Sequence, residues 1–137
     1  MEDPRTVLRS LLEQHSWQDA VGFVPVISVG WFDAQLSPPQ ITVGHISTTV
    51  RNAMVDNRVR RFEAVLAVDV WSDVEEERWK MVTEVDAIIQ KSRSNPGTGL
   101  SYQSVSGWRD LDEVNITPKI YRSRVEVGLT YYLTSQS

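Results

Sequence analysis

The sequence predicts an α+β fold, in which a mixed, mainly antiparallel β-sheet is flanked by an N-terminal helix and one long central helix. Two observations in one segment lead to this prediction. Residues 61–71 alternate between two sets of side chains with the period of two that is typical of a strand. Directly after them, Ser72-Asp73-Val74-Glu75 has the pattern of a capping box, and apolar residues then recur with the helical period of about 3.6 residues. The 137 residues are expected to form one domain around a single core.

The segments before this strand are expected to form a helix and two further strands. Asp3-Pro4 predicts a helix start, because aspartate caps free N–H groups and proline fits the first helical position. The apolar stripe of this helix consists of Val7, Leu8, Leu11 and Leu12. Residues 24–32 are β-branched and aromatic, and residues 40–46 alternate, so both segments predict strands.

Residues 48–61 have no clean period and are expected to form a long loop or a hairpin extension. Long loops in compact domains are usually functional. This segment contains Arg51, Arg58, Arg60 and Arg61, whose guanidinium groups suit contact with phosphates or with an acidic partner. The alternative is a hydrated loop beside a strand. We treat these arginines as candidates for a docking surface.

The second half of the chain is expected to form the long helix and two more strands. The helix is predicted from Ser72 to Gln90, with acidic residues in its first turn that complement the helix dipole. Its buried face is predicted to contain Val74, Met81, Val82, Val85, Ile88 and Ile89. Strands are predicted at residues 100–108 and 120–133, followed by a flexible tail at residues 134–137. The predicted order of elements is therefore α-β-β-β-α-β-β.

Composition and motifs argue against several classes of protein. The chain has no cysteine, which excludes disulfides, thiolate nucleophiles and cysteine-bound zinc and fits synthesis in a cytoplasm. No signal-peptide pattern is present, and the most apolar window, residues 20–32, is too short to span a membrane. His15 and His45 lack the partner spacing of a catalytic or metal site, and no nucleophile or phosphate-binding motif occurs. We therefore expect no enzymatic activity, no cofactor, no metal and no membrane contact.

The tryptophans are the remaining candidates for a functional surface. Trp71 and Trp79 lie near the junction between the central strand and the long helix, and Trp108 lies in a later strand. Trp79 falls beside the apolar stripe of its helix rather than on it. Tryptophan is a frequent anchor of protein interfaces, although packing in the core is an equally good explanation. These three residues are candidate interface aromatics.

Five segments, taken in order, carry a family resemblance. They are residues 7–12 (Val-Leu-Arg-Ser-Leu-Leu), residues 66–72 (Leu-Ala-Val-Asp-Val-Trp-Ser), the helix over residues 77–89, residues 107–110 (Gly-Trp-Arg-Asp) and the strand over residues 124–131 (Arg-Val-Glu-Val-Gly-Leu-Thr-Tyr). With this order of elements the chain resembles the tail terminator or tail-completion proteins of long-tailed bacteriophages and of related archaeal viruses or prophages. The resemblance covers most of the chain, and residues 48–60 have no counterpart in it.

The resemblance implies a structural virion protein. Such a subunit, one domain over residues 1–137, would form a homo-oligomeric ring, a hexamer, that caps the tail tube, ends its polymerisation and joins the tail to the head-neck connector. Its partners would be other copies of itself, the tail tube protein, the neck or connector proteins and, without sequence specificity, the DNA passing through the ring. It would be made in the host cytoplasm and end at the tail-neck junction, and residues 48–61 would be the candidate docking or lumen loop.

Two other roles remain open from the sequence. One is a head-closure or connector-adaptor protein of the neck, which is also a small ring-forming subunit. The other is a small cytoplasmic ligand-binding or adaptor domain, whose pocket would be lined by Trp31, Trp71 and Trp108. The mass of the protein in solution and its binding to tail tubes separate these roles.

Overall fold

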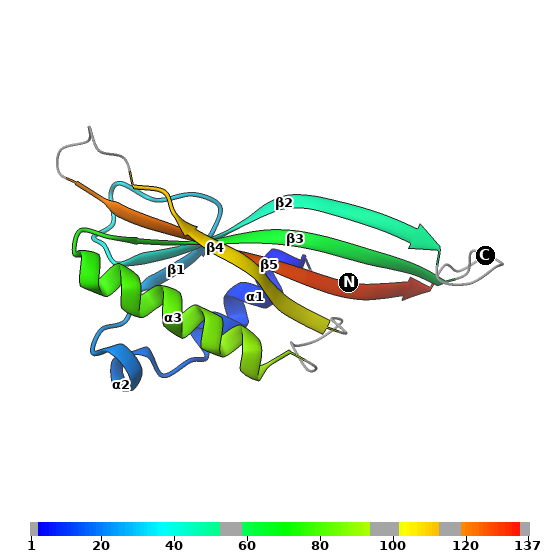
Figure 1. Ribbon diagram of the computed structural model, residues 1–137, viewed down its shortest axis with the longest axis horizontal. Helices are drawn as coiled ribbons and strands as arrows, with labels where there is room; N and C mark the ends of the chain where they lie inside the picture. The colour runs from blue at the N-terminus through cyan, green and yellow to red at the C-terminus, as the bar shows by residue number, and fades with distance from the viewer. Residues whose placement is uncertain (1–2, 53–58, 94–101, 113–118, 135–137) are drawn as a thin grey trace.

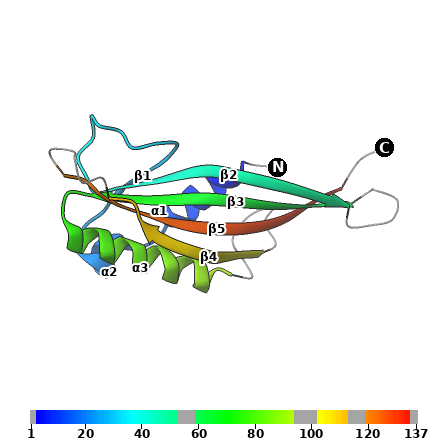
Figure 2. The same ribbon diagram turned by 45° about the horizontal axis from the view of Figure 1, so that its top comes forward.

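A computed structural model describes residues 3–52, 59–93, 102–112 and 119–134 of the chain. These residues form one five-stranded sheet with the strand order β1-β2-β3-β5-β4, covered on one face by helices (Figures 1 and 2). The elements are α1 (Pro4–Glu13), α2 (Trp17–Val21), β1 (Val26–Val29), β2 (Gln40–Asn52), β3 (Val59–Ser72), α3 (Glu75–Lys91), β4 (Tyr102–Asp110) and β5 (Tyr121–Thr134).

The predicted fold class is confirmed, because β1 pairs with β2 in parallel and every other pairing of the sheet is antiparallel. The central strand is β3, whose ladder with β5 runs from Val59 opposite Thr134 to Ser72 opposite Tyr121. The long alternating segment of the sequence is therefore the middle of the sheet. Its period of two sends one set of side chains toward the helices and the other set toward the opposite face.

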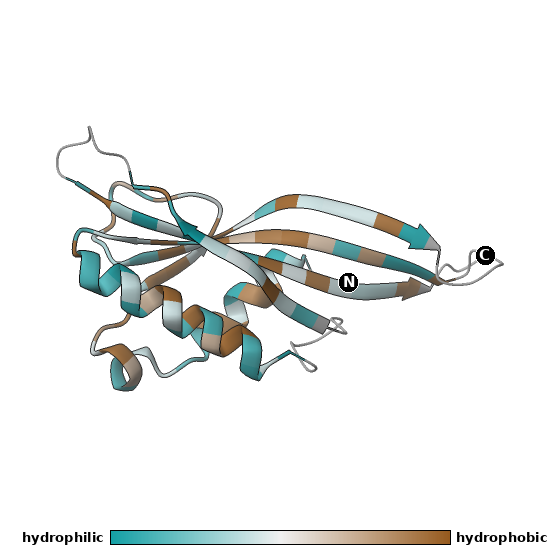
Figure 3. Cartoon of the chain, in the orientation of Figure 1, coloured by the Kyte–Doolittle hydropathy of each residue, from teal (hydrophilic) through white to brown (hydrophobic). Residues whose placement is uncertain are grey.

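The core lies between the helices and one face of the sheet. Apolar residues recur along β3, β5 and the helices in Figure 3, as the alternation and the helical stripes predict. Burying each of these side chains contributes about 1.5–3 kcal/mol before the entropic cost of ordering it. The fully buried members include Leu8, Leu12, Ile41, Val43, Leu66, Val68, Val70, Met81, Val85, Ile89, Val125 and Val127.

The long helix begins later than its capping-box pattern predicts. Ser72 is the last residue of β3, and the N-cap of α3 is Val74, which provides no side-chain cap. The Ser72 hydroxyl accepts a hydrogen bond from the Val74 N–H at 3.0 Å and donates one to Glu77 Oε1 at 2.9 Å. The pairing of Ser72 with Tyr121 holds this residue extended, which delays the helix. Val74, predicted to be buried, is exposed, and the charged Arg78 lies on the buried face instead.

Two further boundaries differ from the prediction. The short helix α2 was not expected; buried Trp17 anchors it by donating from Nε1 to the Leu12 carbonyl at 2.8 Å. It ends at Gly22, whose φ of 86° is the left-handed conformation that glycine adopts without strain. β1 is shorter than the segment predicted for it, because the chain turns at Gly30, where φ is 116°.

Three strands extend beyond the helices as an arm, here defined as residues 46–52 of β2, 59–65 of β3 and 128–134 of β5 (Figure 1). The described residues of the segment expected as a loop or hairpin extension are strand residues of this arm, with Arg51 opposite Arg61. Residues 53–58, with Arg58, lie outside the described residues. Thr134, expected in a flexible tail, pairs with Val59 in the sheet, because β5 continues as far as its partner strand begins.

Candidate functional site

The face of the sheet opposite the helices carries a buried charge cluster. Asp69 of β3 is only 2% exposed and accepts hydrogen bonds from two arginines of β5. Arg122 Nη2 donates at 2.9 Å, and Arg124 donates from Nε at 2.9 Å and from Nη2 at 3.2 Å. The hydrogen bond to Asp69 raises the pKa of Arg124 above its ordinary value. The charges of this cluster are therefore committed to one another.

Aromatic rings enclose Arg122 on the same face. Its guanidinium lies 4.5 Å from the ring centroid of Trp31 and 4.7 Å from that of Trp71, distances typical of cation–π contacts. The two rings meet edge to face at 5.1 Å, and Trp71 Nε1 donates to the Thr42 hydroxyl at 3.0 Å. Trp71, a candidate interface residue, is consequently 8% exposed and packed inside the subunit. Trp31 covers it and is exposed.

The other two candidate tryptophans form an exposed pair. Trp79 of α3 and Trp108 of β4 meet with ring centroids 5.3 Å apart, and they are 53% and 42% exposed. Trp108 lies opposite Val125 in the register and thus on the helix-covered face, away from Trp71. The structure therefore brings together Trp31 and Trp71, but it does not bring Trp108 to them as the expected ligand pocket requires.

The described candidate arginines lie on the arm and divide between its two faces. Arg61 Nη2 lies 2.9 Å from Glu63 Oε1, and Arg51 Nε lies 3.9 Å from the other oxygen of this carboxylate. Arg60 lies on the opposite face, with its guanidinium 5.4 Å from the ring centroid of Phe62. The arm therefore carries cationic groups around its far end rather than on one surface.

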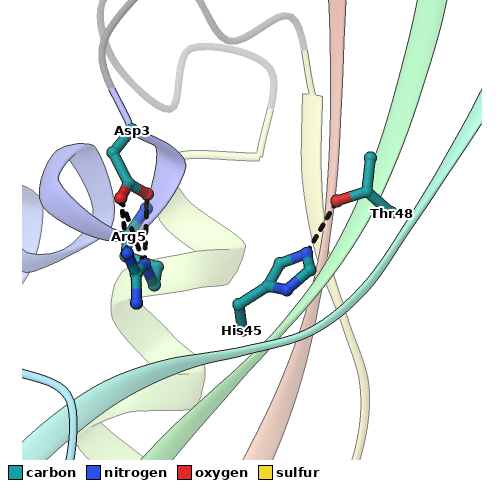
Figure 4. A network of polar contacts seen from close by, with 4 residues as sticks. All are labelled: Asp3, Arg5, His45 and Thr48. Atoms are coloured by element: carbon teal, nitrogen blue, oxygen red, sulfur yellow. Dashed lines mark hydrogen bonds and ion pairs between the residues drawn. The ribbon is translucent and has the colours of Figure 1, made fainter.

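The start of α1 marks where the helices stop covering the sheet. Figure 4 shows Asp3 and Arg5 at this helix end, with His45 and Thr48 of β2 nearby. The Arg5 side chain and N–H hydrogen-bond to Asp3 and lower the pKa of its carboxyl, and the charge of His45 lowers it further. His45 Nε2 lies 2.7 Å from Thr48 Oγ1. Burial raises the pKa of Tyr131 in β5, and the nearby Asp3 charge adds to this.

Sequence reasoning missed a second buried cation, Arg78. It is 5% exposed, forms an ion pair with Asp112, and lies 3.5 Å from Glu75 and 3.7 Å from Asp110. Its guanidinium also lies 5.4 Å from the ring centroid of Tyr121. The only signal in the sequence was an arginine at a position that the helical period assigns to the apolar face. Arg78 thus ties α3 to the end of β4 and to the first residue of β5.

In the described residues, each histidine has one polar side-chain contact and belongs to no metal-binding group. His15 lies 2.6 Å from Glu84 of α3, and His45 contacts Thr48 as described. Within the described ranges, no group of three or more His, Cys, Asp or Glu side chains is arranged to hold a metal ion. No helix in this same part of the chain is long and apolar enough to cross a membrane.

Comparison with known proteins adds the likeness of fold. No protein-family model matches the chain, and no curated protein matches it. Among solved structures it is similar to a chain of one described as "Virion of native gene transfer agent (GTA) particle". The TM-score is 0.71, the sequence identity is 9%, and the match covers 95% of each chain. At this identity the likeness shows that the two chains share a fold over nearly their whole length.

Proposed function

We propose that this chain is a structural subunit of a phage-like virion, and that it forms a ring at the tail-head junction that ends the growth of the tail tube. The observation that carries the proposal is the likeness in fold, over 95% of both chains, to a chain of a gene transfer agent virion. The likeness extends over nearly the whole length of each chain. It supports a structural role in a virion, and the place at the tail-head junction comes from the sequence resemblance.

The distribution of surfaces supports assembly into a ring. The arm projects from one end of the sheet (Figure 1). The exposed Trp79–Trp108 pair belongs to α3 and β4 and lies outside the arm. A ring of identical subunits uses heterologous contacts, so each subunit needs two different adhesive surfaces. The role is steric and interfacial and requires no reaction. Partners are other copies of this chain, the tube protein and the neck proteins.

The arginines of the arm suit a docking or lumen surface. Within the described residues of the arm, Arg51, Arg60 and Arg61 stand against one carboxylate, that of Glu63. A cationic surface of this kind can contact an acidic partner or the phosphates of passing DNA without reading sequence. Replacing Arg58, Arg60 and Arg61 with serine should leave the protein folded and impair the joining of tails to heads. Arg9→Ser, which removes an arginine of α1 paired with Glu13, is the matched control.

The test of the proposal is the control of tube length. The tail tube protein of the same virus or prophage is polymerised alone and with the purified chain. Native mass spectrometry follows the mass of the chain, and electron microscopy follows the tubes. We expect a closed ring, free or on the tube end, and tubes that stop growing once it binds. If the tubes grow unchanged and the protein binds DNA-filled heads, the protein is a head-closure protein rather than a terminator of the tube. Binding to neither would refute a place at the junction.

A further inference from the structure

One surface of the arm is mainly apolar, and no described helix covers it (Figure 1). It is here called the arm patch and consists of Val50, Arg60, Phe62 and Leu133, which the register places in two neighbouring rows on the helix-side face. Val50 and Leu133 are 40% and 39% exposed. Further back on this face Phe62 stacks on buried Tyr131, near the start of α1. The patch is thus a continuation of the core face past the end of the helices, and such a surface favours a partner.

A second surface of the same chain has the opposite charge. It is here called the Trp surface and consists of Trp79, Trp108, Glu75 and Glu76. Both glutamates are strongly exposed and lie three and four residues before Trp79, so they border it on the helix surface. Exposed tryptophan beside charged groups is typical of the residues that dominate interface energies.

The arm patch and the Trp surface have complementary groups: a guanidinium on one, and carboxylates beside aromatic rings on the other. The arm patch carries one guanidinium, that of Arg60, whereas Arg51, Arg61 and Glu63 lie on the opposite face of the arm. Around the Trp surface lie the carboxylates of Glu75, Glu76 and Asp110. Glu76 lies 3.5 Å from the ammonium of Lys80, and Glu75 and Asp110 lie 3.5 and 3.7 Å from the guanidinium of the buried Arg78. A guanidinium pairs with carboxylates and also packs on aromatic faces, and a Trp surface bordered by glutamates offers both. The arm patch therefore offers the guanidinium of Arg60 to a surface on which, among the described residues, three carboxylates outnumber two cationic groups.

We propose that the arm patch of one copy packs on the Trp surface of a second copy, with Arg60 between the glutamates and the tryptophan rings. This inference rests on the proposed ring and names its contact. Each surface pairs with the other kind, so one copy can bind through its arm patch and still offer its Trp surface to the next copy. Where two copies share only one such contact, the contact is heterologous, and repeated heterologous contacts close into a ring or continue as a filament.

The experiment uses two full-length variants that each break a different half of the contact. Arg60→Glu reverses the charge of the arm patch, and Trp79→Ala removes the anchor of the Trp surface; both side chains are exposed, so the fold should survive. Arg9→Glu and Leu36→Ala are the controls, since they alter an arginine and an exposed apolar side chain elsewhere. Circular dichroism checks folding, and light scattering with native mass spectrometry measures assembly.

We expect each variant alone to associate at least about tenfold more weakly than the wild type, with the controls unchanged. A mixture of the two should form a 1:1 heterodimer and nothing larger, because one intact arm patch and one intact Trp surface remain. Adding Glu76→Arg to Arg60→Glu should restore part of the association. If rings form only on tubes, the amount of protein bound at tube ends replaces mass as the measurement, with the same order of variants expected.

Rings that persist in both variants would overturn this contact and leave the proposed function standing. A mixture that grows into full rings would also overturn it. Wild-type protein that forms no ring and does not stop tube growth would instead refute the proposed function, and the contact with it.

Discussion

Removing the Asp69 carboxylate tests whether the buried charge cluster holds the sheet together. Asp69→Ala would leave Arg122 and Arg124 without the three hydrogen bonds that they donate to it. A cation that loses its partner in a buried site keeps its desolvation cost and loses the compensating attraction. The substitution should therefore cost far more than the loss of an ordinary surface ion pair.

The magnitude follows from the burial of the three groups. Breaking a fully buried pair costs about 3–5 kcal/mol. The side chains of Arg122 and Arg124 are 13% and 21% exposed, so water reaches them in part and the lower end, about 3 kcal/mol, applies. With an unfolding entropy of about 2.1 cal/mol/K per residue, a chain of 137 residues loses about 3.5 °C of Tm for each kcal/mol. The expected fall in Tm is about 10 °C.

The assay is thermal and urea unfolding of wild type and variant, measured at a concentration where both have the same oligomeric state. Glu13→Ala is the control, because it breaks the half-exposed Arg9–Glu13 pair and should cost only about 0.3–0.5 kcal/mol. Arg124→Ala should cost less in the Asp69→Ala background than in the wild type, since the two groups are coupled. A fall in Tm of less than about 2 °C for Asp69→Ala would refute the reasoning.

Three further predictions concern the core, a turn and pH. Leu12→Ala should lower the free energy of unfolding by about 2–5 kcal/mol, because Leu12 is completely buried, and a cost below about 1 kcal/mol in urea unfolding would contradict this. Gly22→Ala should lower the free energy of unfolding by about 1–2 kcal/mol, because φ at this residue is 86° and an L side chain is strained there. The space around Gly22 is open, so no steric clash adds to this cost. Gly107→Ala, also in open space, is the comparison. Burial raises the pKa of Tyr131 above 10.0, so the unfolded state loses this proton first as pH rises. The stability that this phenol contributes is complete below pH 10.0 and is lost as pH rises through the folded pKa. The fall in Tm over this pH range should be smaller in Tyr131→Phe than in the wild type. Equal falls in both proteins would contradict the raised pKa of Tyr131.

The elements were predictable where the local period is clear. The segment around β3 alternates and α3 follows a helical stripe, and both patterns depend only on residues close in sequence. Boundaries were less predictable because tertiary pairing moved them. Ser72 has the chemistry of a helix cap, yet its place opposite Tyr121 keeps it in the sheet. Residues 48–52 and 59–61 lack a clean period because they lie on an exposed arm, where no core imposes alternation.

The candidate surfaces were less predictable still. Sequence alone identified the tryptophans and arginines by type, and could not tell that Trp71 packs on Arg122 while Trp79 stays exposed beside Trp108. The burial of Asp69 and Arg78 could not be predicted, since their partners lie 53 to 55 and 34 positions away in the chain. Contacts at that separation depend on which strands become neighbours.

Local chemistry determined the α+β class, the central strand, the long helix and the absence of cysteine chemistry, because period and residue type act within a few residues. The tertiary structure decided the strand order β1-β2-β3-β5-β4, the projecting arm, the burial of Asp69 and the separation of the Trp surface from the arm patch. The physical reason is that burial and pairing are long-range: a side chain is buried or exposed according to what distant segments bring to it, and that information is not carried by its own neighbours in the sequence.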